Sequence, residues 1–215
     1  MSASNPILID QLLGAAPVLP VLSIARLSDA VPLARALVEA GLTVLEITLR
    51  SEAALAAIEA IARAVPEAIV GAGTVLKRAD LLAVADAGAR FAISPGATPM
   101  LYQDALDSRI PWIPAIGTAS ELMQGLEFGY TRFKFFPAAS SGGVAALKAF
   151  AGPFPRVRFC PTGGIDLAQA PAYLKLPNVI LVGGSWMVPA DLLDAGDWAG
   201  IARLARAAAA LRTGL

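Results

Sequence analysis

The sequence alternates between two kinds of segment along its whole length. Short apolar runs rich in β-branched residues recur roughly every 20 to 25 residues, and an Ala- and Leu-rich run with helical spacing follows each of them. Several helical runs end in a glycine that suits a left-handed helix cap. Eight apolar runs are predicted strands, at residues 18–24, 43–50, 68–75, 90–96, 110–117, 132–138, 156–164 and 178–186.

Strict alternation of strand and helix predicts how these segments are connected. It gives parallel strands joined by right-handed crossovers. Eight such units in 215 residues fit a closed (β/α)8 TIM barrel better than an open sheet. An extra helix is predicted near residues 6–13, before the first strand. Because no linker or low-complexity segment interrupts the pattern, we expect one α/β barrel domain over residues 1–215.

The composition indicates which kind of partner the protein binds and in which cellular compartment it is expected. The chain is 56% hydrophobic and only 16% charged, but its charge-free stretches reach about 15 residues, short of the roughly 18 to 20 that span a bilayer. Seventeen basic residues balance seventeen acidic ones, and no basic cluster stands out in the sequence. The sequence therefore does not indicate binding to nucleic acid or to a membrane surface. With one cysteine and no secretory signal pattern, we expect a cytoplasmic protein that binds a small molecule.

The chain contains no histidine. This excludes Ser-His-Asp and Cys-His triads, imidazole proton shuttles and His-rich zinc sites, although metal sites built from oxygen ligands are not excluded. Acid–base chemistry must therefore fall to carboxylates, lysine, tyrosine or water.

The second predicted strand places charged side chains on one of its two faces. Leu45 and Ile47 share one face of the run TVLEITLR, whereas Glu46 and Arg50 share the other. The apolar face must meet the helices, so Glu46 and Arg50 are predicted to face the barrel interior. Arg50 lies at the carboxyl end of its strand, where barrel active sites are found.

Lys134 lies in the middle of a predicted strand among phenylalanines, on the same face as Phe136. Burial disfavours the charged ammonium and leaves a fraction of free amine, which is what a Schiff-base lysine requires. The alternative is a structural ion pair between Lys134 and Glu46 across the barrel. The residues alone leave both interpretations open.

Three predicted strand ends carry small residues, namely GAGTV (71–75), PTGGI (161–165) and VGGSW (182–186). Backbone N–H groups at such turns form anion cradles, and barrels often bind phosphate after the last two strands. Thr162 and Ser185 add hydroxyl donors there. The alternative is simple turn geometry. Cys160, in an apolar strand, is predicted to be a packed core thiol.

Several of these motifs occur together in a known family. LEITLR (45–50), GAGTV, FAISPG (91–96), FKFFPA (133–138), FCPTGGI (159–165) and GGSWMVPAD (183–191) resemble, in order, the motifs of the 2-keto-3-deoxy-6-phosphogluconate (KDPG) aldolases. The resemblance implies a class I, metal-independent aldolase without a cofactor. Such an enzyme cleaves the phosphorylated 2-keto-3-deoxy sugar acid to pyruvate and glyceraldehyde 3-phosphate in the Entner–Doudoroff pathway, and is a homotrimer.

The resemblance also implies roles for individual residues. Lys134 would be the Schiff-base lysine and Glu46 the general acid and base. The remaining roles are these: Arg50 and Thr74 hold the pyruvate carboxylate, Phe136 and Pro95 line the pocket, Thr162 contacts substrate hydroxyls, and Gly163, Gly164, Gly184 and Ser185 bind phosphate.

Two loops depart from the family pattern. Ala115 and Gly117 replace the expected glycine and serine, and Ala139 and Ser140 stand in a segment that lacks an expected acidic residue. Neither change touches Lys134, so the reaction type is expected to hold while acceptor specificity stays open. The galactonate epimer and 4-hydroxy-2-oxoglutarate are alternative substrates, with Thr162 favouring the gluconate epimer. A phosphate-binding epimerase or isomerase barrel and a non-catalytic binding barrel also fit the charged interior and the glycine-rich strand ends.

Overall fold

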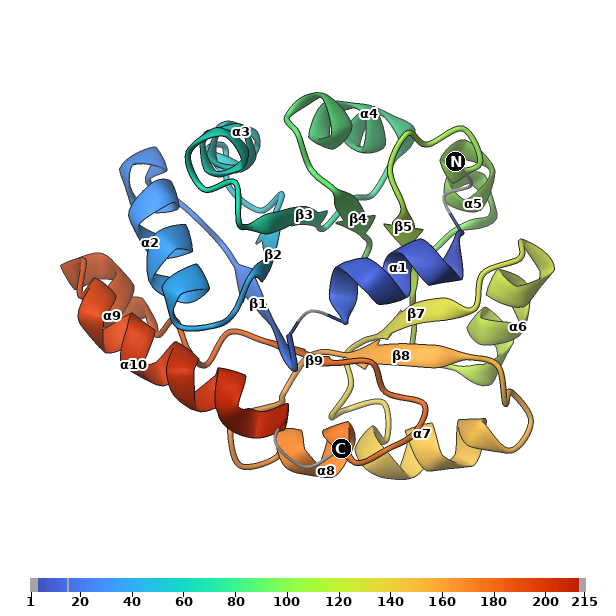
Figure 1. Cartoon of the computed structure of the whole chain (residues 1–215). Coiled ribbons are helices and arrows are strands. Elements are labelled where there is room, and N and C mark those ends of the chain that lie inside the picture. Colours follow the sequence, from blue (N-terminus) through green and yellow to red (C-terminus); the bar gives the residue numbers. More distant parts are fainter. Residues whose placement is uncertain (1–3, 15, 213–215) are drawn as a thin grey trace.

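A computed structural model describes residues 4–14 and 16–212 (Figure 1). Its helices are α1 (Pro6–Leu13), α2 (Leu27–Glu39), α3 (Ala54–Ala64), α4 (Arg78–Asp86), α5 (Pro99–Ala105), α6 (Ala119–Glu127), α7 (Gly143–Ala151), α8 (Ala170–Leu174), α9 (Ala190–Ala195), α10 (Trp198–Ala209) and the 3-10 helix η1 (Ala210–Arg212). Its strands are β1 (Val18–Leu22), β2 (Val44–Thr48), β3 (Ile69–Gly73), β4 (Phe91–Ile93), β5 (Trp112–Ile113), β6 (Ala115–Ile116), β7 (Arg132–Phe135), β8 (Arg158–Pro161) and β9 (Val182–Gly184). The predicted extra N-terminal helix is present as α1.

The strands form two sheets in which every described strand pair is parallel. One sheet has the order β5-β4-β3-β2-β1-β9, and the other has the order β6-β7-β8. One isolated bridge joins Thr162, just after β8, to Gly183 of β9, and another joins Phe159 of β8 to Val179, just before β9. The α/β class and the parallel strands are as predicted, and Figure 1 shows helices α2 to α10 on the outside of the strands.

The predicted fifth strand, residues 110–117, was wrong as one continuous element. It is divided into β5 and β6 by Pro114, because proline has no backbone N–H to continue a ladder. Ile113 pairs with β4, whereas Ala115 pairs with Lys134 of β7. The Pro114 carbonyl still accepts a hydrogen bond from the Lys134 backbone N–H, at 2.9 Å. The segment therefore leaves one sheet and enters the next.

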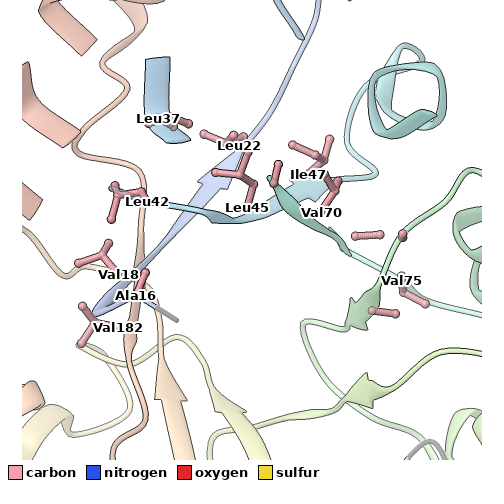
Figure 2. Close-up of a cluster of buried hydrophobic side chains, with 14 of the residues drawn as sticks. Ala16, Val18, Leu22, Leu37, Leu42, Leu45, Ile47, Val70, Val75 and Val182 are labelled. Atoms are coloured by element: carbon pink, nitrogen blue, oxygen red, sulfur yellow. The ribbon is translucent and has the colours of Figure 1, made fainter. Parts of the chain in front are cut away.

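Apolar side chains pack on both faces of the strands. Leu45 and Ile47 of β2 belong to the core between strands and helices, which also contains Leu22 of β1 and Leu37 of α2 (Figure 2). Val44, on the opposite face of β2, packs in a separate inner cluster that includes Leu13 of α1. Because side chains alternate along a strand, Glu46 shares the inner face with Val44, as predicted.

Helix α1 covers the amino-terminal ends of the strands. The Asn5 side chain caps it by accepting from the backbone N–H groups of Ile7 and Leu8. Asp10 holds the helix to β7 through Arg132, with Nε and Oδ1 2.6 Å apart. The opposite, carboxyl-terminal ends carry the charged side chains described below. Among the residues described, no helix has both the length and the apolar character needed to cross a membrane.

Candidate active site

Lys134 of β7 and Glu46 of β2 form an ion pair on the inner face of the strands. Lys134 Nζ lies 2.9 Å from Glu46 Oε1 and 3.2 Å from Oε2. The two side chains are 7% and 1% exposed. Burying such a pair is costly unless its geometry is good, and here one ammonium donates to both oxygens of one carboxylate. The pair anticipated from the sequence is therefore present, and its geometry fits both a structural and a chemical role.

Phe136 and Cys160 are neighbours of the Lys134 side chain. Lys134 Nζ lies 5.5 Å from the centre of the Phe136 ring, within the range of a cation–π contact. Cys160, the register partner of Lys134 on β8, is buried in the inner cluster, which confirms the predicted core thiol. Burial raises the pKa of the Cys160 thiol to about 12, although the nearby Lys134 charge opposes that rise. A neutral thiol therefore lies beside the pair.

Arg50 follows β2 and is exposed at the carboxyl end of the strands. Its Nε donates to Thr48 Oγ1 at 3.1 Å, and the Thr48 hydroxyl donates to the Leu22 carbonyl of β1 at 2.8 Å. Thr48 thus restricts the guanidinium through Nε and leaves its terminal nitrogens for a ligand. Thr48 was not predicted from the sequence as a functional residue, although its place between Glu46 and Arg50 on the same strand face was a usable signal.

Thr74 directly follows β3 and has a positive φ of 61°. This conformation is unusual for a β-branched residue and costs on the order of 1–3 kcal/mol, so the surroundings must hold it. Pro95 is exposed in the loop after β4. Because the strands are parallel, both residues lie at the same end of the strands as Arg50. The structure therefore brings the residues assigned to the carboxylate and the pocket wall to one edge.

The glycines after β8 adopt conformations that other residues rarely take. Gly163 and Gly164 have φ values of 101° and 71°. The Thr162 backbone is bridged to Gly183, so the ends of β8 and β9 lie side by side. A Cβ on Gly183 would overlap the Thr162 hydroxyl and lie 3.1 Å from its Cβ. Gly183 therefore makes room for Thr162, a role that the sequence did not reveal.

Gly184 and Ser185, both assigned to phosphate, have different surroundings. A Cβ on Gly184 would overlap the Trp186 ring, so aromatic packing alone accounts for a glycine at this position. Ser185 is exposed and lines a pocket together with Arg50 and Ser23. In the part of the chain that the structure describes, no three Cys, Asp or Glu side chains gather as a metal site.

Comparison with known proteins identifies the family. The family model "Aldolase: KDPG and KHG aldolase" matches residues 9–204. The KHG/KDPG aldolase of Escherichia coli K12 is 56% identical over 199 residues, covering 93% of each chain. The 2-dehydro-3-deoxy-phosphogluconate aldolase of Pseudomonas aeruginosa is 50% identical and covers 93% of this chain and 91% of its own.

A solved structure agrees with these relatives. The KDPG aldolase of Legionella pneumophila, with pyruvate captured at low pH as a covalent carbinolamine, superposes with a TM-score of 0.91 at 48% identity. The match covers 93% of this chain and 97% of that one. The chain therefore belongs to the KDPG and KHG aldolase family and is an aldolase, a lyase.

Proposed function

We propose that this chain is a class I aldolase that cleaves KDPG to pyruvate and glyceraldehyde 3-phosphate. The observation that supports it most is the buried contact of 2.9 Å between Lys134 Nζ and Glu46 Oε1. A carbinolamine is the adduct of an amine and a ketone, and the Legionella relative holds pyruvate in that form. Lys134 is the amine that we assign to this step.

The reaction begins inside the ion pair. The Lys134 ammonium passes a proton to the Glu46 carboxylate, and the free amine attacks the C2 ketone of the substrate. The carbinolamine oxygen then leaves as water, with a proton returned by Glu46, and a protonated iminium remains. The C3–C4 bond that must break lies two bonds from the iminium nitrogen, which can accept the electron pair of that bond.

Cleavage and release use the same carboxylate. Glu46 takes the proton of the C4 hydroxyl as the C3–C4 bond breaks, the aldehyde forms, and the bonding electrons move onto the iminium to give an enamine. Glu46 then protonates C3 of the enamine. Water hydrolyses the resulting iminium, which releases pyruvate and restores the lysine.

The remaining residues are proposed to hold the two charged ends of the substrate. At the pyruvate end, a guanidinium such as that of Arg50 binds a carboxylate through two parallel hydrogen bonds. At the other end, backbone N–H groups at left-handed glycines suit an anion. The full assignment is Arg50 and Thr74 for the carboxylate, Phe136 and Pro95 for the pocket wall, Thr162 for hydroxyls, and Gly163, Gly164, Gly184 and Ser185 for phosphate.

We further propose that the strands close into a (β/α)8 barrel as one domain over residues 1–215. The direct passage from β5 to β6 and the bridge between Thr162 and Gly183 support closure on both sides. A cytoplasmic homotrimer without a cofactor, acting in the Entner–Doudoroff pathway, is the assembly and setting that the family resemblance favours.

The unphosphorylated 4-hydroxy-2-oxoglutarate is a second candidate substrate. The 56% identical Escherichia coli relative is named KHG/KDPG aldolase. The residues proposed for phosphate are three glycines and Ser185, with no cationic side chain, so a substrate without phosphate leaves no buried charge unpaired at this end. The galactonate epimer is the closest alternative among phosphorylated substrates.

Trapping with borohydride tests the mechanism. Pyruvate and borohydride should leave a reduced adduct on the peptide that contains Lys134, and Lys134→Met should abolish both the adduct and pyruvate release. An unmodified peptide, under conditions that trap a known class I aldolase, would favour an epimerase, an isomerase or a binding barrel. Full activity in EDTA is expected, and its loss would contradict the metal-independent mechanism.

A substrate comparison tests the specificity. Pyruvate release should be fastest from KDPG, measured against the galactonate-derived epimer and 4-hydroxy-2-oxoglutarate at equal concentrations. Faster release from the galactonate epimer would overturn the choice of substrate while leaving the lysine chemistry intact.

A further inference from the structure

Strand β3 presents two glycines to the inner face of the strands, beside β2. Gly71 pairs in register with Glu46, and Gly73 pairs with Thr48. Ala72, which lies between the two glycines, packs in the core on the helix side. By alternation, Gly71 and Gly73 therefore face the same interior as Glu46.

The space that a side chain at Gly73 would fill is occupied by Glu46. A Cβ built there would lie 2.8 Å from both Cγ and Cδ of Glu46 and would overlap Oε1. Oε1 is the oxygen that accepts the 2.9 Å hydrogen bond from Lys134 Nζ. Gly73 is therefore in contact with the proposed proton carrier at the atom that meets the lysine.

The backbone does not explain a glycine at this position. Unlike Gly163 and Gly164, Gly73 is not among the residues with positive φ. A side chain is thus excluded by lack of space alone. The carboxylate has little room to retreat, because Glu46 is 1% exposed and any retreat moves Oε1 relative to Lys134.

We propose that Gly73 is a positioning residue that sets the place of the Glu46 carboxylate against Lys134. The inference rests on the proposed function, in which Glu46 carries protons between substrate and lysine. It also gives the GAGTV segment a role different from an anion cradle. A methyl group at residue 73 pushes Cγ and Cδ outward by about 0.5–1 Å to reach ordinary contact distance. A misplacement of this size in a catalytic group lowers rates by about 100-fold.

The test is Gly73→Ala, read by two reactions with pyruvate. The rate at which the methyl protons exchange with deuterated solvent depends on proton transfer by Glu46. Borohydride added after equilibration with pyruvate instead reports the amount of lysine adduct, which does not depend on how fast Glu46 moves protons. We expect exchange to fall about 100-fold at saturating pyruvate, while trapping falls much less. Equal losses in both reactions, or unchanged exchange, would overturn the proposal.

Gly71→Ala is the matched control. Its Cβ would overlap the Phe91 ring, and the three atoms nearest to it all belong to Phe91 and none to Glu46. It lies on the same strand and face, so it reproduces the strain of a buried methyl group. Exchange per folded molecule should be unchanged in this variant, and a fall equal to that of Gly73→Ala would show that the effect is general strain.

A second measurement covers the case in which Gly73→Ala folds poorly. The urea midpoint should drop on Gly73→Ala in the natural chain, but not when the same change is made in Glu46→Ala, where the obstructing carboxylate is gone. An equal drop in both backgrounds would overturn the steric contact. This comparison does not depend on catalysis. If the natural chain neither traps nor exchanges pyruvate, the proposed function fails while the contact can still be confirmed.

Discussion

Replacing Lys134 with methionine leaves the Glu46 carboxylate buried without a cation. The two side chains are 7% and 1% exposed in the ion pair, so little water reaches the remaining charge. Removing one partner of a buried pair typically costs about 3–5 kcal/mol. Against a total stability of roughly 5–15 kcal/mol for a protein, this is a large fraction. We therefore expect Lys134→Met to lower the free energy of unfolding by about 3–5 kcal/mol at pH 7.5.

The double variant separates the lost charge from the lost packing. Methionine at both Lys134 and Glu46 fills similar volume without any charge, and such replacements of buried pairs are often neutral or stabilising by about 1–4 kcal/mol. We expect the double variant to be at least as stable as the natural chain. The costs of the two single changes should therefore be strongly non-additive, as expected for residues in direct contact.

Urea unfolding followed by circular dichroism measures all four proteins of this cycle at pH 7.5. A Lys134→Met variant as stable as the natural chain, or single costs that simply add in the double variant, would refute the reasoning.

Three further predictions concern the surroundings of the pair. Because burial raises the pKa of Cys160 to about 12, a disulfide reagent at pH 8 should label this thiol only after unfolding, and rapid labelling of the native chain would contradict its placement. Thr48→Val removes the 3.1 Å contact to Arg50 Nε and should raise KM for pyruvate in the exchange assay about 5-fold, with Thr48→Ser restoring it. Ser185→Ala should raise KM for KDPG severalfold and leave pyruvate exchange unchanged, and a change in both would place Ser185 at the pyruvate end instead.

The faces of the strands could be predicted because alternation is a local property. Leu45 and Ile47 had to meet the helices, so Glu46 had to point inward, and the structure confirms this for β2. By the same alternation, Lys134 shares its predicted face with Phe136, whereas Phe133 and Phe135 pack on the helix side. These inferences need only the period of two and one apolar face.

The division of the fifth strand could not be predicted in the same way. Pro114 was visible in the sequence, but proline also occurs at strand ends, and its effect depends on which neighbours pair on each side. Here Ile113 and Ala115 pair with different strands, and the Pro114 carbonyl still accepts from Lys134. The division of this strand therefore depends on which strands lie beside it in the folded chain.

The roles of the glycines at the site could not be predicted from the local sequence either. The sequence offered Gly163 and Gly184 as equal candidates for anion binding. The first has the left-handed conformation, whereas the second is explained by the Trp186 ring lying against it. Likewise, the contact of Gly73 with Glu46 depends on the pairing of β2 with β3. A glycine that makes space for a side chain far away in the sequence carries no local signal.

The two interpretations of Lys134 that the sequence left open are compatible once the charges are followed through the proposed reaction. At rest, Lys134 Nζ and Glu46 Oε1 lie 2.9 Å apart, and we assign them as an ammonium facing a carboxylate. After proton transfer, an amine faces a neutral acid, and after dehydration a cationic iminium faces the carboxylate again. At none of these stages does the interior hold an isolated charge, which is the state that a buried site tolerates least. The structural ion pair is thus the resting form of the chemical one, and it lets a chain without histidine move protons using one lysine and one glutamate.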